Sequence, residues 1–262
     1  FISPGTKAPN RMGFSKYASY INTLTEQKYG RPLILAMSAD LSDSTNISGF
    51  SKGYGGARDK GFYEKKSNTK SPLFPQGITE FTNAGMMSGS STVNFSTKPY
   101  ESFSGYYGAV STYGSFSYLK YGPLRLFSQL AQDSELKVGK IIWVVGHSGP
   151  ETAEDSRTHY GIFAPGVTQL FPNGSIINIH PWEHNEVAPS LTAALKTEVP
   201  IIAIHLTRPS IVIPDRKKMG IADHKDSAKG AYIIKNYDKK KPQKGVVIIR
   251  GTAPINSLMQ IL

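Results

Sequence analysis

The sequence predicts an α/β fold with a doubly wound, mostly parallel sheet, followed by the beginning of a second α/β domain. Three short apolar runs, residues 32–37, 141–145 and 199–206, have the length and composition of buried strands. Helical patterns lie between them, and strands that alternate with helices favour a parallel sheet. A chain of 262 residues with 39% hydrophobic content is long enough for one large domain or two smaller ones.

The first part of the chain contains a helix, a strand and a long loop. Residues 10–28 are predicted to be helical because their apolar side chains recur mostly every three or four residues. The strand at 32–37 ends in a polar loop, 38–44, whose small hydroxyl and carboxylate side chains can bind a ligand or cap the next helix. Residues 48–76 are rich in Gly, Ser and Lys without periodicity, which predicts a long loop.

The next segment begins with a small-residue helix over 82–91, with Glu80 near its start, and a short strand over 93–95. Residues 100–127 are dense in aromatic side chains, which is typical of a core and also suits stacking on a flat heterocycle. Gly122-Pro123 is expected to kink or break a helix there, and residues 129–136 are expected to be helical.

After residue 161 the alternation of strand and helix continues. A strand over 175–179 is followed by a helical segment that starts with acidic residues, and then by the strand at 199–206. Residues 209–229 form a polar, basic linker. The runs 232–234 and 246–249 are expected to be the first strands of a second, incomplete α/β unit.

The polar loop that follows the strand at 141–145 is the richest in ionisable groups. It contains two imidazoles and three carboxylates, together with an arginine, in His147, Glu151, Glu154, Asp155, Arg157 and His159. Open α/β sheets bind ligands beyond the carboxyl ends of their strands, where such loops lie. This favours a functional site, and an ordinary solvated loop is the alternative.

The composition limits the possible partners and compartment. The net charge of +11 is concentrated in residues 52–70 and 208–250 and suits phosphorylated small molecules, nucleic acid or an acidic partner. No zinc-finger spacing, RNP-type motif or heptad array accompanies it, so nucleic acid is disfavoured. No apolar run approaches a membrane span. The absence of cysteine excludes disulfides and thiol catalysis and fits a reducing compartment, so a cytoplasmic protein is expected.

Several motifs together resemble the pyrimidine-binding domain of transketolase, a thiamine-diphosphate enzyme. The matching stretches, in chain order, are SADLSDSTN, GITEFTNAG, HSGPETAEDSRTHYG, HPWEHNEVAPSLTAAL and HLTRP. The resemblance runs from about Arg11 to the C-terminus. It implies a pyrimidine-type domain of the thiamine-diphosphate-binding fold over 1–208, a linker over 209–229, and the start of a C-terminal domain over 230–262.

The resemblance implies a cofactor site. Glu80 would hydrogen-bond the aminopyrimidine ring and promote the imino tautomer that activates thiamine diphosphate. Phe116 would stack on the pyrimidine, with Tyr113 nearby, and Asp40 would also contact the cofactor. The structural alternatives are a carboxylate stabilised by a helix N-terminus for Glu80 and core packing for the two aromatic residues.

It also implies a substrate site. Arg11, Ser44, His147 and Arg208 would converge on the phosphate of a sugar, for which guanidinium, imidazole and hydroxyl donors are well suited. Asp155 would bind the C2 hydroxyl of the substrate. His159 would hold the reacting hydroxyl or carbonyl and assist proton transfer, so that Glu80, His147 and His159 are the catalytic candidates. The other histidines, His180, His184, His205 and His224, are expected to be structural.

The implied activity is transfer of a two-carbon ketol unit between sugar phosphates of the pentose phosphate pathway, by a homodimeric enzyme. The family's Gly-Asp-Gly motif with its later Asn, which holds Mg²⁺ or Ca²⁺ and the diphosphate, is absent, so no metal ligand is assigned here. A missing N-terminal portion or another subunit is expected to supply that half. The alternatives are a 1-deoxyxylulose-phosphate synthase-like or phosphoketolase-like enzyme, and a non-catalytic scaffold subunit.

Overall fold

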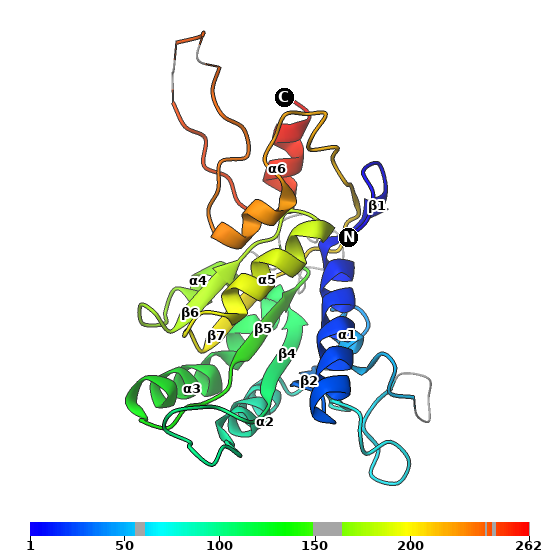
Figure 1. Cartoon of the computed structure of the whole chain (residues 1–262), viewed down its shortest axis with the longest axis vertical. Helices are drawn as coiled ribbons and strands as arrows, with labels where there is room; N and C mark the ends of the chain where they lie inside the picture. The colour runs from blue at the N-terminus through cyan, green and yellow to red at the C-terminus, as the bar shows by residue number, and fades with distance from the viewer. Residues whose placement is uncertain (56–60, 149–163, 239, 243–244, 262) are drawn as a thin grey trace.

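The computed structural model describes residues 1–55, 61–148, 164–238, 240–242 and 245–261. Its centre is a six-stranded sheet in the order β3-β2-β4-β5-β7-β6 (Figure 1). The strands are β2 (Ile34–Ser38), β3 (Leu73–Phe74), β4 (Tyr107–Tyr113), β5 (Ile141–Gly146), β6 (Ile176–Ile179) and β7 (Ile201–His205). All pairs in this sheet are parallel, which confirms the predicted α/β class.

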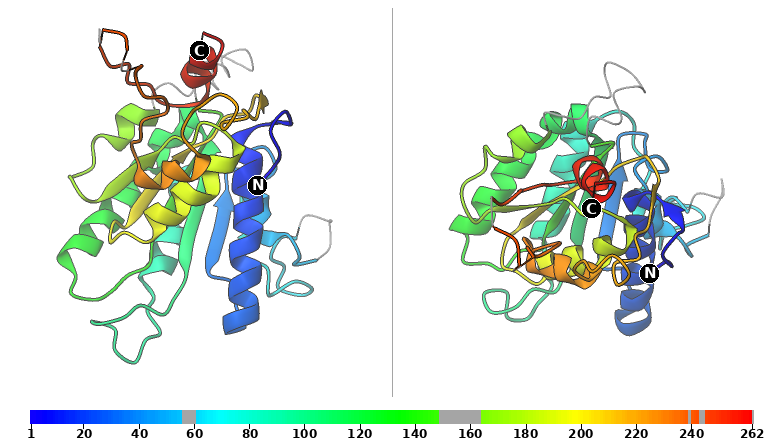
Figure 2. Two further views of the ribbon diagram at one scale, coloured as in Figure 1. Left: turned by 45° about the horizontal axis from the view of Figure 1, so that its top comes forward. Right: turned by 90° about the horizontal axis from the view of Figure 1, so that it is seen from above.

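Helices cover both faces of this sheet, as the view from above in Figure 2 shows. One layer contains α1 (Asn10–Tyr29) and α5 (Val187–Leu195), and the other contains α2 (Glu80–Thr92) and α3 (Tyr121–Asp133). Along β5, Ile142 and Val144 pack against the first layer, whereas Trp143 and its alternate neighbours pack against the second. Because both faces are buried, the strand has a continuous apolar sequence.

The connections place the switch point of the sheet between β2 and β4. From β2 the chain goes outward to β3 at one edge and then returns to β4 on the other side of β2. Ligands of doubly wound folds bind in the crevice at such a point, beyond the carboxyl ends of the strands. The residues at and directly after the ends of β2, β4 and β5 are therefore the ones that the fold brings to a candidate site.

The structure corrects the prediction for residues 100–127. Their middle part forms β4, a central strand that the sequence analysis did not predict, because its aromatic ends obscured the pattern. Small residues are required there, since a Cβ atom on Gly108 would lie 2.9 Å from the Cβ atom of Met87 on α2. Gly122-Pro123 does not break a helix. It lies in the first turn of α3, where proline needs no N–H partner.

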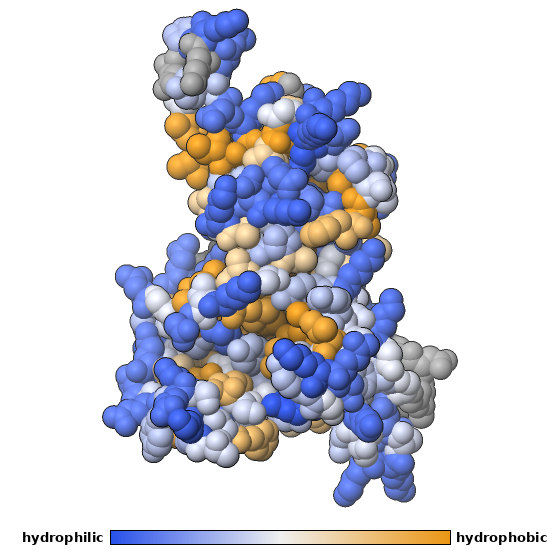
Figure 3. Space-filling view, in the orientation of Figure 1, coloured by the Kyte–Doolittle hydropathy of each residue, from blue (hydrophilic) through white to orange (hydrophobic). Residues whose placement is uncertain are grey.

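Other corrections concern short strands. Residues 93–95 form no strand, and Asn94 makes only an isolated bridge with Gly105. Residues 232–234 and 246–249 are not strands either. A strand needs a pairing partner, and neither run has one in the described part of the chain, where Val246 and Ile248 are 89% and 92% exposed. Figure 3 shows hydrophobic surface on the upper left of the molecule, where Figure 1 shows the segment that precedes α6.

The remaining elements are short. The pair β1 (Lys7–Ala8) and β8 (Ile211–Val212) is antiparallel. The helices are α4 (Ala164–Thr168), α6 (Thr252–Met259) and the 3₁₀ helices η1 (Ile47–Ser51), η2 (Gly114–Lys120), η4 (His184–Glu186) and η5 (His224–Lys229). Among the residues described, no helix is both long and apolar enough to cross a membrane.

Two helical glycines give a test of how α1 packs. A Cβ atom on Gly13 would lie 2.5 Å from the carbonyl oxygen of His184, whereas one on Gly85 of α2 would meet open space. Gly85→Ala should raise the free energy of unfolding by about 0.5–1 kcal/mol, because alanine restricts the unfolded chain. Gly13→Ala should instead lower it by about 1–3 kcal/mol through overpacking. Urea unfolding measures both, and equal effects would contradict the close packing of α1 on η4.

Candidate functional site

Side chains from four segments meet at the switch point. Ser44 lies in the loop after β2, Tyr113 is the last residue of β4, His147 directly follows β5, and Arg11 lies in the first turn of α1. The carboxyl ends of parallel strands lie at one edge of the sheet, and the N-terminal turn of α1 reaches the same edge. This arrangement brings together residues that are up to 136 positions apart in the sequence.

Direct contacts join these residues. Arg11 Nη1 donates a hydrogen bond to the carbonyl oxygen of Ser44 at 2.6 Å and lies 3.3 Å from Nε2 of His147. The hydroxyl groups of Ser44 and Tyr113 are 2.8 Å apart. The rings of Tyr113 and His147 are stacked, with centroids 4.0 Å apart. We name these four residues the anion cluster, because their guanidinium, imidazole and two hydroxyl groups are hydrogen-bond donors of the kind that bind anions.

The backbone of the site is unusual. His147, Asp40 and Asn46 are non-glycine residues with positive φ, at 51°, 57° and 60°. His, Asp and Asn tolerate this region better than other side chains, yet each such residue costs about 1–3 kcal/mol that the surrounding packing must offset. Gly146 permits the close approach of the segment after β2, because a Cβ atom there would lie 2.7 Å from Cγ2 of Thr45. The strain lies at the candidate site, which is typical of functional loops.

Glu80 forms a second part of the site. It is the first residue of α2 and only 5% exposed, and the hydroxyl of Thr112 on β4 donates a hydrogen bond to its Oε1 at 2.9 Å. The N-terminus of a helix favours a carboxylate. α2 packs against η2, which carries the half-buried Phe116. The structure therefore places an oriented carboxylate on a helix that packs against the aromatic-bearing η2.

The other predicted site residues are placed as follows. Asp40 is exposed at the end of β2, and Arg208 is exposed shortly after β7. The hydrogen bonds and ring contact given above, between described residues, include neither Asp40 nor Arg208. Tyr113, predicted beside the cofactor, lies against His147 and Ser44. Asp155 and His159 lie outside the described residues.

Thr112 is a site residue that the sequence analysis missed. In the sequence it is one hydroxyl residue within an aromatic stretch, and its contact with Glu80 spans 32 positions. The only available signal was its place at the end of a strand, and that strand was itself not predicted.

A stacked pair of histidines lies near the same edge. The rings of His180 and His205 have centroids 3.9 Å apart, and His205 is within hydrogen-bond distance of Asn178 Oδ1, at 3.0 Å, and Ser148 Oγ, at 3.2 Å. Burial lowers the pKa of His180 to about 3 and lowers that of His205 well below its ordinary value, so both rings are neutral at pH 7. Within the described ranges, no three His, Cys, Asp or Glu side chains are grouped to hold a metal ion.

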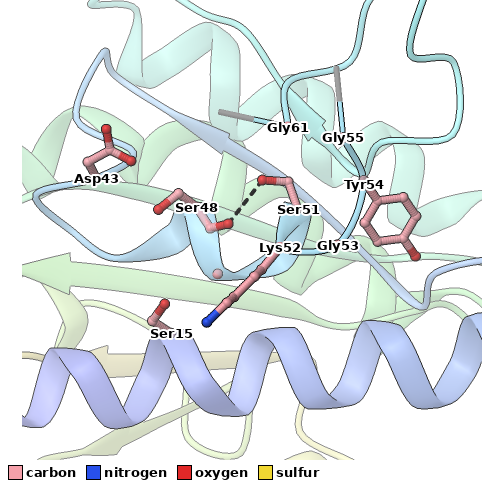
Figure 4. A pocket seen from close by; sticks show the side chains of 10 residues that line it. Ser15, Asp43, Ser48, Ser51, Lys52, Gly53, Tyr54, Gly55 and Gly61 are labelled. Carbon is pink, nitrogen blue, oxygen red and sulfur yellow. Dashed lines mark hydrogen bonds between the residues drawn. The ribbon is translucent and has the colours of Figure 1, made fainter. Parts of the chain in front are cut away.

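A pocket of about 390 Å³ lies between α1 and the residues of and around η1 (Figure 4). Its walls come from α1, from η1 and from the glycine-rich residues that follow η1. Asp43, the neighbour of Ser44, lines one end, and Lys52 extends toward Ser15 on α1. Neither Glu80 nor His147 lines this pocket, so it is distinct from the two parts of the site described above.

The fold and the site define a doubly wound α/β domain with an oriented, buried carboxylate and an anion cluster at its switch point. Residues 18–212 match the family model described as transketolase, pyrimidine binding domain, and the chain belongs to this family. No curated protein matches the chain.

Solved structures of transketolases share the fold. A transketolase from Campylobacter jejuni subsp. jejuni NCTC 11168 is 15% identical with a TM-score of 0.58, covering 80% of this chain and 27% of that one. An arginine-to-leucine mutant of the Pichia stipitis enzyme, in complex with fructose-6-phosphate, is 20% identical with a TM-score of 0.65, covering 89% and 30%. A second Pichia stipitis mutant gives 20% identity, a TM-score of 0.64, and 91% and 30% coverage. The chain thus spans less than a third of the length of these enzymes.

Membership of this family implies binding of thiamine diphosphate. The described residues fit the pyrimidine end of that cofactor. One oxygen of Glu80 is held by Thr112, which leaves the other oxygen for a ring nitrogen, and Phe116 on the neighbouring 3₁₀ helix has a flat face for the ring.

Proposed function

We propose that this chain supplies the pyrimidine-binding half of a thiamine-diphosphate-dependent, transketolase-like enzyme that transfers a two-carbon ketol unit between sugar phosphates. The observation that carries the proposal is Glu80, buried at the start of α2 and oriented by Thr112. When bound, the cofactor supplies a nucleophilic thiazolium carbon for the ketol transfer. Glu80 holds a proton at the pyrimidine ring nitrogen, Phe116 stacks on the ring, and Asp40 and Tyr113 complete the cofactor side.

The anion cluster binds the phosphate of the sugar. Arg11 and His147 are already 3.3 Å apart, and Ser44 contributes a hydroxyl group that Tyr113 holds in place. Preorganised donors lose little conformational freedom when they bind a phosphate. Arg208 joins them as a second guanidinium. Asp155 binds the C2 hydroxyl, and His159 assists proton transfer.

The rest of the enzyme completes the site. The diphosphate and its Mg²⁺ or Ca²⁺ are held by another domain or subunit, and the full enzyme is a homodimer in the cytoplasm. Residues 1–208 are the pyrimidine-binding domain, 209–229 the linker, and 230–262 the start of the C-terminal domain.

Product analysis tests the function. The complete enzyme, with thiamine diphosphate and Mg²⁺, is given a ketose phosphate donor and an aldose phosphate acceptor, and the products are identified by mass spectrometry. A ketose phosphate that is two carbons longer than the aldose phosphate acceptor supports the proposal. In parallel reactions pyruvate replaces the ketose donor, or inorganic phosphate replaces the aldose acceptor. A deoxyketose phosphate in the first, or an acyl phosphate in the second, would replace the proposal with one of the related activities. Cofactor binding without any turnover would indicate the scaffold subunit.

The phosphate role of the anion cluster gives a separate prediction. Arg11→Gln should raise the KM for the sugar phosphate about tenfold or more, since hydrogen bonds to charged groups contribute about 1.5–3 kcal/mol. The KM for the same sugar without its phosphate should not change. Lys16→Gln, an exposed charge removal on the same helix, is the matched control. Equal effects of Arg11→Gln on both substrates would exclude a phosphate contact.

A further inference from the structure

Asn10 is a fully buried asparagine that lies outside the motifs of the sequence analysis. It is the first residue of α1, directly before Arg11 of the anion cluster, and is 1% exposed. Its Oδ1 accepts a hydrogen bond from the backbone N–H of Thr207 at 2.7 Å, and its Nδ2 donates to the carbonyl oxygen of Pro181 at 2.8 Å. These backbone partners fix which way the amide faces. Leucine has no polar group and an ionised aspartate cannot donate, so neither could replace it.

The hydrogen bond from Thr207 links two segments that carry guanidinium groups. Asn10 directly precedes Arg11, and Thr207 directly precedes Arg208, although the two bonded residues are 197 positions apart in the sequence. Arg208 is exposed, so a ligand in solution can reach it. The side chain of Asn10 therefore sets the separation of the two backbone positions from which these guanidinium groups extend.

The segment that contains Thr207 is also attached to the end of β5. The carbonyl oxygen of Leu206 accepts a hydrogen bond from the backbone N–H of Ser148 at 2.9 Å, and the N–H of Leu206 donates to the carbonyl oxygen of Val145 at 2.9 Å. Ser148 directly follows His147, whose φ is positive. Because Leu206 and Thr207 are adjacent, these contacts join the turn at His147 to the first residue of α1. They connect all three segments that carry the nitrogen donors of the proposed phosphate site.

Thr252 supports this contact from the C-terminal part of the chain. It is the first residue of α6 and is 5% exposed. Its hydroxyl donates to the carbonyl oxygen of Trp182 at 2.8 Å, and lies 3.1 Å from the hydroxyl of Thr207 and 3.4 Å from Nδ2 of Asn10. Buried polar networks whose members are all hydrogen-bonded are rigid and specify one arrangement. The hydroxyl of Thr252 therefore holds both sides of the contact between Asn10 and Thr207.

We propose that Asn10 is a positioning residue, supported by Thr252, that sets the spacing of Arg11, Arg208 and His147 for a phosphate dianion. This rests on the proposed function, which assigns the phosphate of the sugar to these side chains. A guanidinium binds phosphate through a planar fork of N–H groups, so its direction matters. Donors that are in place before binding also lose little conformational freedom. Loss of Asn10 lets the segments shift against each other and weakens phosphate binding without removing a phosphate contact.

The test compares the KM for a sugar phosphate with the KM for the same sugar without its phosphate, in the complete enzyme. Asn10→Leu keeps the approximate volume and removes all three hydrogen bonds. It should raise the first KM about tenfold and leave the second unchanged, since loss of a group that orients metal ligands costs about 10–100-fold in affinity and the lower end is expected for a phosphate. An unchanged KM for the sugar phosphate, or equal increases for both substrates, would overturn the proposal.

Asn22 gives a matched control on the same helix. It is also fully buried, and its amide donates to the carbonyl oxygens of Ile34 and Phe50 and accepts from the N–H of Ile34. Ile34 begins β2, so this contact lies at the end of the strand away from the site. Asn22→Leu should destabilise the fold but leave both KM values unchanged. A selective increase as large as that of Asn10→Leu would show a general effect of losing a buried asparagine, and the proposal would be wrong.

Thr252→Val covers the case in which Asn10→Leu does not fold. Valine has the shape of threonine without its hydroxyl group, so the KM for the sugar phosphate should rise about threefold or more, as expected for loss of a hydrogen bond. Thr252→Ser keeps the hydroxyl and should restore the original value. Equal KM values in the valine and serine variants would exclude the supporting role of Thr252 and overturn the proposal.

Arg11→Gln, measured alongside, separates this inference from the proposed function. If Arg11→Gln raises the KM for the sugar phosphate selectively and Asn10→Leu does not, only the role of Asn10 is wrong. If neither has a selective effect, the anion cluster binds no phosphate, and the phosphate role and this inference both fail. With Arg11 and Arg208 both replaced by Gln, Asn10→Leu should cause no further increase, because it acts through them. A further increase would mean that Asn10 acts by another route, against the proposal.

Discussion

Replacing Glu80 by Gln is expected to lower the turnover of the complete enzyme by about 10²–10⁴-fold, the range for loss of a positioned acid–base group. Glutamine keeps the size of the side chain and an oxygen that can accept the hydrogen bond from Thr112. It cannot exchange a proton with the ring nitrogen in the way that a carboxyl group can. The fold and the affinity for the cofactor should therefore change much less than turnover.

Three measurements separate these effects. Turnover is measured at saturating cofactor, cofactor affinity by calorimetry, and stability by thermal unfolding. Glu101→Gln is the matched control, since Glu101 is an exposed carboxylate whose partner is Lys98. A variant that binds the cofactor and retains at least half of the turnover would show that Glu80 is only a helix N-terminal carboxylate, which is the structural alternative.

Three of the strands that the sequence predicted, β2, β5 and β7, have apolar side chains on both faces. β2, β5 and β7 lie inside a parallel sheet covered by helices, and such strands appear as continuous apolar runs. β4 is equally central but was missed, because tight packing against α2 requires Gly108 and small neighbours there. Its packing partners, and not an intrinsic strand preference, determine that sequence.

The same distinction applies to the site. Arg11, Ser44 and His147 were predicted together from motifs, and the structure brings them into contact because the sheet gathers the ends of its strands. Thr112 has no motif. Its contact with Glu80 depends on how α2 packs against β4. A sequence pattern does not contain that information.

A buried ion network in the segment 209–229 gives the second large prediction. The sequence predicts a basic linker there, yet Arg216 is only 7% exposed. Its Nη2 donates to Glu183 at 2.9 Å and to Glu186 at 2.7 Å, and its guanidinium lies 4.7 Å from the ring centroid of Trp182. Tyr232, beyond this segment, also donates a hydrogen bond to Glu186. These contacts attach Arg216 and Tyr232 to η4, directly before α5.

Arg216→Met is expected to lower the free energy of unfolding by about 3–5 kcal/mol, because it leaves buried carboxylates without their counter-ion. Burial already raises the pKa of Glu183, and loss of Arg216, whose charge lowers it, raises it further above the unfolded value of about 4.3. A carboxyl group whose pKa is higher in the folded state binds its proton more tightly there. The free energy of unfolding therefore falls as the pH rises above the unfolded pKa of about 4.3. The deficit of the variant should therefore grow between pH 4 and pH 7, as measured by urea unfolding at several pH values.

Lys98→Met is the matched control for this experiment. Lys98 pairs with Glu101 at 3.1 Å, but both side chains are about two-thirds exposed or more, at 69% and 70%. Its loss should cost less than about 1 kcal/mol, without a comparable trend between pH 4 and pH 7. If residues 209–229 acted only as a loose tether, Arg216→Met would cost no more than Lys98→Met. A several-fold larger cost that increases with pH would instead mean that Arg216 fixes this segment to the domain, and so sets where residues 230–261 emerge from it.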